Sequence, residues 1–281
     1  MRYTAEFCDR EYNARASIPD NLEIFDRWAA RSLDVRRRAA GVFDLPYGRS
    51  PAERLDLFPA AAPAAPLFVF IHGGYWRALD KSDFSFLAPA FVRAGISLAI
   101  PNYALAPKVT VEEITRQMLG ALAWLYRNGH AYGCDRHRIV VGGHSAGGHL
   151  SAMMMCALWP QYAPDLPTEL VRGALAISGL YDLEPIRHTT FLNPDLGLDR
   201  RRALRLSPAW MPPASDAPLV TAVGGLESSE FHRQNRLIAE RWPRNFRYDV
   251  PMPGHHHLSV CEALGEDDSA LFAAARELCD W

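Results

Sequence analysis

The five residues Gly143-His144-Ser145-Ala146-Gly147 decide how the rest of the chain is interpreted. An apolar run at 138–141 precedes them and a helix-like run at 148–158 follows, which predicts a strand, a sharp turn and a helix. In so tight a turn, the positions two before and two after the serine lie against neighbouring backbone, where only glycine fits without steric cost. The new helix directs its first amides toward the serine hydroxyl, so an anion formed there meets N–H donors.

Composition and charge restrict the class of protein. The 281 residues suffice for one large α/β domain or two small ones, and 49% hydrophobic with 22% charged residues is ordinary for a globular protein. A formal net charge of -2 gives no electrostatic reason to expect a nucleic-acid or anionic-membrane partner. The sequence leaves the oligomeric state open, and a homodimer is compatible with it.

Cysteine usage and hydropathy bear on localisation. An odd number of cysteines cannot all pair, and their scattered spacing does not match a metal site: Cys8, Cys134, Cys156, Cys261 and Cys279. The first residues have no apolar core like that of a signal peptide, and no later run could span a bilayer. We therefore expect a cytoplasmic protein without a membrane segment.

Strands alternate with helices along most of the chain, which predicts a single α/β domain over 1–281 with a mostly parallel sheet covered on both faces. Residues 1–40 are predicted to be a helical arm, with a solvated face formed by Arg27, Arg31, Arg36, Arg37 and Arg38. Residues 53–58 alternate polar and apolar, so we expect a half-exposed strand. Residues 179–215, rich in proline, arginine and aspartate, are predicted to be a lid-like insertion over the site.

A serine hydroxyl needs a base to take its proton and an acid to orient that base. Glu227 follows the predicted strand that ends at Val223, and three consecutive histidines follow the strand that ends near Val250. This is the chain order serine, acid, histidine. The apolar Leu258 should begin the last buried turn, so His257 is the predicted base.

Alternatives remain for both partners of the serine. His255 and His256 are the other candidate bases, and Asp182, in the loop after the preceding strand, is the rival acid. The triple histidine also has an interpretation as a metal site, but one short run rarely closes such a site without further ligands. We therefore predict no metal and no cofactor.

The segment from His72 to Trp76 follows a buried strand and supplies the predicted oxyanion hole. Its glycines let consecutive N–H groups face the serine, so the expected donors are the amides of Gly74, Tyr75 and Ala146, with Gly73 as the alternate. Tyr75 and Trp76 either line an aromatic substrate pocket or pack beneath the lid. Three neighbouring histidines are expected to be structural: His72, His144 and His149.

With these motifs in view, the sequence resembles the α/β-hydrolase superfamily, and within it the arylformamidase (kynurenine formamidase) branch near the hormone-sensitive-lipase-like esterases. The resemblance covers nearly the whole chain and rests on segments 12–15, 72–76, 143–150, 178–183 and 227–234. Two features depart from the family pattern. The family usually has aspartate where this chain has Glu227, and one histidine where this chain has three.

The resemblance implies hydrolysis of an aryl formamide such as N-formyl-kynurenine by a Ser-His-acid acyl-enzyme mechanism, as part of tryptophan catabolism. A formyl group needs almost no acyl pocket, whereas an aromatic leaving group needs a slot. The alternative is a carboxylesterase that uses the same catalytic residues on short-chain or aryl esters. A binding module that has lost catalysis and a metal-dependent hydrolase are further alternatives.

Overall fold

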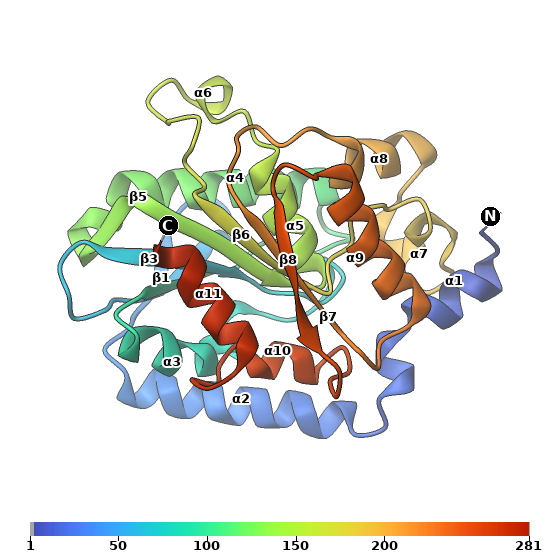
Figure 1. Ribbon diagram of the computed structural model, residues 1–281, viewed down its shortest axis with the longest axis horizontal. Helices are drawn as coiled ribbons and strands as arrows, with labels where there is room; N and C mark the ends of the chain where they lie inside the picture. Colours follow the sequence, from blue (N-terminus) through green and yellow to red (C-terminus); the bar gives the residue numbers. More distant parts are fainter. Residues whose placement is uncertain (1–2, 281) are drawn as a thin grey trace.

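The computed structural model describes residues 3–280; the ends of the predicted arm and of the final helix, at 1–2 and 281, lie outside the described residues. One eight-stranded sheet has the order β1-β2-β4-β3-β5-β6-β7-β8 (Figure 1). The β1–β2 and β2–β4 pairs are antiparallel, and every other pair is parallel. The strands are β1 (Val42–Pro46), β2 (Arg54–Phe58), β3 (Ala65–Ile71), β4 (Ser97–Pro101), β5 (Cys134–His144), β6 (Gly173–Ile177), β7 (Leu219–Gly224) and β8 (Phe246–Met252).

Helices cover both faces of the sheet, each over its own apolar core, and this confirms the predicted architecture. One face carries α4 (Val111–Asn128), α5 (Ala146–Met155) and α9 (Ser229–Arg241), with α1 (Ala5–Tyr12) beside α9. The other carries α2 (Asn21–Arg38), α3 (Ala88–Arg93), α10 (Ser259–Ala263) and α11 (Ala270–Asp280). The connections hold short helices: η1 (Ala14–Ser17), η2 (Lys81–Leu87), η3 (Gly129–Tyr132), α6 (Trp159–Tyr162), η4 (Ile186–His188), α7 (Asn193–Leu196), α8 (Arg200–Arg205) and η5 (Pro208–Trp210).

The turn from β5 to α5 is as tight as the sequence predicts. Ser145 has φ 58° and ψ -116°, a conformation that is strained for a residue with a side chain. A Cβ at Gly147 would lie 1.8 Å from the Ile71 carbonyl oxygen, and one at Gly143 would lie 2.4 Å from Gly147 main chain. Both glycines are therefore required by backbone that passes too close for a side chain.

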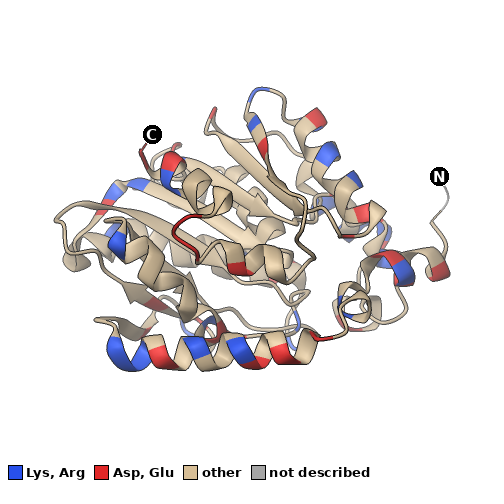
Figure 2. Cartoon of the chain, turned by 60° about the horizontal axis from the view of Figure 1, so that its bottom comes forward, with Lys and Arg blue, Asp and Glu red and all other residues tan. Residues whose placement is uncertain are grey.

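The predicted half-exposed strand at 53–58 is wrong. In β2 all residues after Arg54 are buried, including Asp56, which is completely inaccessible. Its carboxylate lies 2.8 Å from Lys81 Nζ and also pairs with Arg36 of α2, so its charge is neutralised inside the fold. Arg36 is thus an exception to the solvated face expected for the arm, while Arg37 and Arg38 are exposed among the alternating charges of α2 (Figure 2).

Cysteines and hydropathy can also be assessed in the structure. All five cysteines are free and buried. Within residues 3–280, no helix combines the length and apolar character needed to cross a bilayer. In the same range, His, Cys, Asp and Glu side chains form no group of three or more that could hold a metal ion.

We expect Gly147→Ala to destabilise the protein by about 3 kcal/mol or more, because the added methyl group would overlap the Ile71 carbonyl. The matched control is Gly120→Ala in α4, where the nearest atom to the new methyl is 3.7 Å away. This control should gain about 0.5–1 kcal/mol from the higher helix propensity of alanine. Urea denaturation followed by circular dichroism measures both effects, and a Gly147→Ala variant as stable as the control would contradict the steric argument.

Candidate active site

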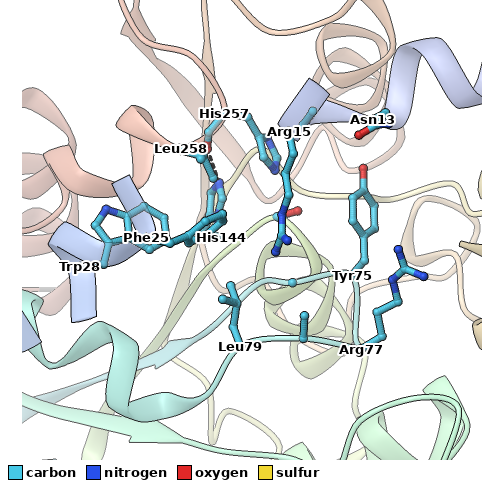
Figure 3. Close-up of a pocket in the computed structure, with 14 residues that line it drawn as sticks. Asn13, Arg15, Phe25, Trp28, Tyr75, Arg77, Leu79, His144, His257 and Leu258 are labelled. Carbon is cyan, nitrogen blue, oxygen red and sulfur yellow. Dashed lines mark hydrogen bonds between the residues drawn. The ribbon is translucent and has the colours of Figure 1, made fainter. Parts of the chain in front are cut away.

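Ser145 stands where β5 meets α5, at the wall of a cavity of about 80 Å³ (Figure 3). Only 2% of its surface is exposed. The cavity is lined by residues from four parts of the chain: the N-terminal arm, the loop after β3, the turn at 143–147 that joins β5 to α5 (called the elbow below), and the loop after β8. His257 lies in the same lining as Ser145, so the structure brings these two predicted residues together.

His257 and Glu227 form a buried hydrogen-bonded pair, with 2.6 Å between His257 Nδ1 and Glu227 Oε2. The other carboxylate oxygen of Glu227 accepts from Ser178 Oγ at 2.5 Å and from the Gly224 amide at 2.7 Å. These donors hold the longer glutamate side chain in one orientation. Glu227 can therefore occupy the position where the family usually has aspartate.

The remaining histidines of the run point elsewhere. His256 Nδ1 accepts from the amides of Leu258 and Ser259, both at 3.2 Å, and so satisfies amides at the start of α10. The carbonyl of His255 accepts from the Leu226 amide, and its Nδ1 is buried without a partner among the described residues. Within residues 3–280, neither of these two rings forms a hydrogen bond or ion pair with Glu227.

Asp182 is engaged in different interactions. Its Oδ1 accepts from the Glu184 amide at 3.2 Å, and its Oδ2 lies 3.4 Å from Nη1 of Arg233 in α9. It therefore caps a turn and pairs with an arginine, and the structure does not bring it to His257.

The sequence-based expectation for His144 missed one of its contacts. Its Nε2 lies 2.7 Å from the carbonyl oxygen of His257, and the two rings are 4.6 Å apart. Burial, reinforced by the neighbouring His257, lowers the pKa of His144 well below its usual value, so the ring is neutral and Nε2–H donates. The residue before the serine thus ties the β8 loop to the elbow. The position of His144 directly before Ser145 indicates that it lies near the site. The sequence does not indicate which loop its side chain contacts.

The loop after β3 has an unusual backbone. Gly74, Tyr75 and Trp76 have φ of 96°, 50° and 58°, so three successive residues adopt left-handed conformations. Within residues 3–280 the amides of Gly74, Tyr75 and Ala146 donate no hydrogen bond. A Cβ on Gly73 would come 3.2 Å from Ser145 Cβ, which places this loop directly beside the serine. These free donors are available to a negative charge near Ser145.

Of the two aromatic residues predicted to line the pocket, the structure supports one. Tyr75 lies in the lining, with its hydroxyl donating to the Tyr12 carbonyl at 2.6 Å. Trp76 is wrong as a pocket residue: it is completely buried, belongs to the core and packs edge-on against His149 at 5.0 Å.

The pocket is bordered by the N-terminal arm instead of the predicted lid. Arm residues 13–15, 25 and 28 line the cavity, whereas residues 179–215 contribute none of its lining. The insertion contacts a residue of the lining instead: Nη1 of Arg77 donates a hydrogen bond to the carbonyl of Phe191, which lies in the insertion, at 2.7 Å. The arm is held by α9, since Tyr12 Oη donates to Glu230 at 2.6 Å and Ser228 Oγ donates to the Glu11 carbonyl at 2.6 Å.

Comparisons with known proteins identify relatives of this chain. The BD-FAE family model matches residues 55–159. The kynurenine formamidase of Salmo salar is 33% identical over 281 residues, which cover 95% of this chain and 92% of that protein. Another relative, from Danio rerio and also named kynurenine formamidase, is 32% identical over 69% of this chain and 66% of its own length.

A solved structure from a Silicibacter species, provisionally described as a thioesterase, has a TM-score of 0.83 and 35% identity, and covers 94% of this chain and 97% of its own. An esterase from Pyrobaculum calidifontis, at 17% identity and a TM-score of 0.70 over 95% of both chains, shares the fold. The similarities to the Salmo salar protein and to the two solved structures extend over nearly the whole chain. The chain is a hydrolase, and it belongs to the arylformamidase (kynurenine formamidase) branch of the α/β-hydrolase superfamily.

Proposed function

We propose that Ser145 is the nucleophile of an acyl-transfer reaction, with His257 as its base and Glu227 as the acid that orients this base. The observation that carries the proposal is the 2.6 Å contact between His257 and Glu227 at a cavity that Ser145 also lines. Because Glu227 accepts the Nδ1 proton, the other ring nitrogen of His257 is left free to take the proton of the serine.

In the first half of the reaction, Ser145 Oγ attacks the substrate carbonyl while His257 takes its proton. The negative charge on the carbonyl oxygen is met by the amides of Gly74, Tyr75 and Ala146, with Gly73 as the alternate. His257 then gives the proton to the leaving amine, which departs and leaves an acyl group on Ser145. Water, deprotonated by His257, releases the acid and restores the serine.

The proposed substrate is N-formyl-kynurenine, which would yield kynurenine and formate. Two observations support an aryl formamide. Two relatives of this chain are named kynurenine formamidases, and the cavity beside Ser145 has aromatic residues in its lining. Phe25, Trp28 and Tyr75 supply aromatic surface in the lining, on which an aryl leaving group can pack.

A carboxylesterase acting on short-chain or aryl esters is the second candidate, because esterases share the fold and the same groups would cleave an ester. We expect kcat/KM for N-formyl-kynurenine to exceed that for 4-nitrophenyl acetate by about tenfold or more, a difference of about 1.4 kcal/mol in transition-state binding. A substrate panel measures this, with Ser145→Ala as the inactive control. A higher value for the ester would favour the esterase instead.

Replacing Glu227 with glutamine should lower kcat by about a thousandfold or more, because an amide cannot hold His257 in the required tautomer. The matched control is Asp182→Asn, which changes another carboxylate in a loop after a strand. It should change kcat by less than about threefold, because the Asp182 carboxylate pairs with Arg233 and not with His257. Steady-state kinetics on one substrate compare the two. The reverse ranking would show that the acid is Asp182.

A further inference from the structure

The cavity beside Ser145 carries positive charge without a balancing acid. Its lining includes two arginines, Arg15 from the arm and Arg77 from the loop after β3. Among its lining residues, all taken from the described chain, there is no aspartate or glutamate. A cavity with this lining favours an anionic group on the molecule that enters it.

Only one of these two arginines is free to serve that group. Arg77 Nη1 lies 2.5 Å from Asp195 Oδ2 and 2.7 Å from the Phe191 carbonyl, so its charge is already paired outside the cavity. The guanidinium of Arg15 makes no ion pair or hydrogen bond within residues 3–280. It is stacked over the ring of Phe25, with 4.6 Å from Cζ to the ring centroid.

Arg15 is held toward the cavity by the fold of the arm. It lies in η1, whose Ser17 hydroxyl donates to the Ala14 carbonyl and whose Arg15 carbonyl accepts from Asn21 Nδ2. Figure 3 shows its side chain extending into the pocket between His144 and Tyr75. The contact with Phe25 is a cation–π interaction with the ring face, and it uses none of the N–H donors of the guanidinium, which remain available to a ligand.

The protein groups around Arg15 disfavour its positive charge. Partial burial, together with the neighbouring positive charge of Arg77, lowers the pKa of Arg15. A carboxylate bound to the guanidinium would compensate for both effects and would supply two parallel hydrogen bonds.

We propose that Arg15 binds a carboxylate on the leaving group of the substrate, so that the enzyme selects aryl formamides or aryl esters whose leaving group carries a carboxylate. The proposal rests on the proposed function in taking Ser145 as the site of acyl transfer. N-formyl-kynurenine belongs to this class, because its leaving amine carries a carboxylate on the side chain.

Two substrate pairs test the role of Arg15: N-formyl-kynurenine with its methyl ester, and 4-acetoxybenzoate with 4-acetoxybenzamide. Within each pair the acyl group is the same. The leaving group of one member has a carboxylate, and the other member, called neutral below, has an uncharged methyl ester or amide at that position. In Arg15→Gln we expect KM for the carboxylate member to rise about 10- to 100-fold, with kcat and the kinetics of the neutral member within about threefold of wild type. Arg15→Lys should recover part of the loss, because it keeps the charge without the bidentate fork.

The matched control is Arg31→Gln, which removes another arm arginine stacked on a phenylalanine, 4.9 Å from the Phe86 centroid and outside the cavity lining. It should leave both pairs unchanged. Equal losses on charged and neutral members in Arg15→Gln would mean that Arg15 merely supports the fold, and this would overturn the proposal. Unchanged KM values for both carboxylates would overturn it as well.

The same data separate this proposal from the proposed function. If wild type does not hydrolyse N-formyl-kynurenine but Arg15→Gln still loses its preference for 4-acetoxybenzoate, the formamidase assignment fails and carboxylate recognition stands. If N-formyl-kynurenine is hydrolysed equally well by wild type and Arg15→Gln, the formamidase assignment stands and carboxylate recognition fails.

Discussion

The helix that follows Ser145 approaches β3 so closely that Gly147 has no room for a side chain, and the rest of the site depends on this contact. The approach forces Ser145 into its strained conformation and sets the first amide of α5 beside it. It also aligns the end of β5 with the end of β3, whose following loop carries the other free amides. One steric constraint thus fixes the serine relative to every N–H group proposed to stabilise charge.

Much of this arrangement could be predicted because it depends on local patterns. The glycines on either side of Ser145 indicate a tight turn, where a side chain would not fit. Continuous apolar runs indicate strands that are buried on both faces. Parallel strands place their carboxyl ends along one edge, so the order of strands and loops along the chain was enough to expect Glu227 and His257 near Ser145. His257 could be preferred within its run because the apolar Leu258 had to be buried, as it is.

The contacts that sequence reasoning missed are long-range. Asp56 was expected to be exposed because polar and apolar residues alternate in β2. That pattern does not reveal Lys81 and Arg36, which come from distant segments and neutralise its charge. Trp76 looked like a pocket residue because the direction of its side chain depends on positive φ values that its residue type does not indicate. The role of the arm was hidden for the same reason, since its residues reach the cavity only through the docking of α1 and α2 on the sheet domain.

The docking of α1 joins two halves of the site. Its last residues accept hydrogen bonds from Tyr75, in the loop with the free amides, and from Ser228, next to the acid. If this short helix detaches, both loops lose a restraint in the same event. One core then loses Cys8 and Tyr12, while the sheet and the rest of both cores remain packed. A local opening of this kind costs less free energy than global unfolding. Gentle heating would therefore inactivate the enzyme while its far-ultraviolet spectrum still reports a folded protein, and ligands that hold the arm closed would protect it.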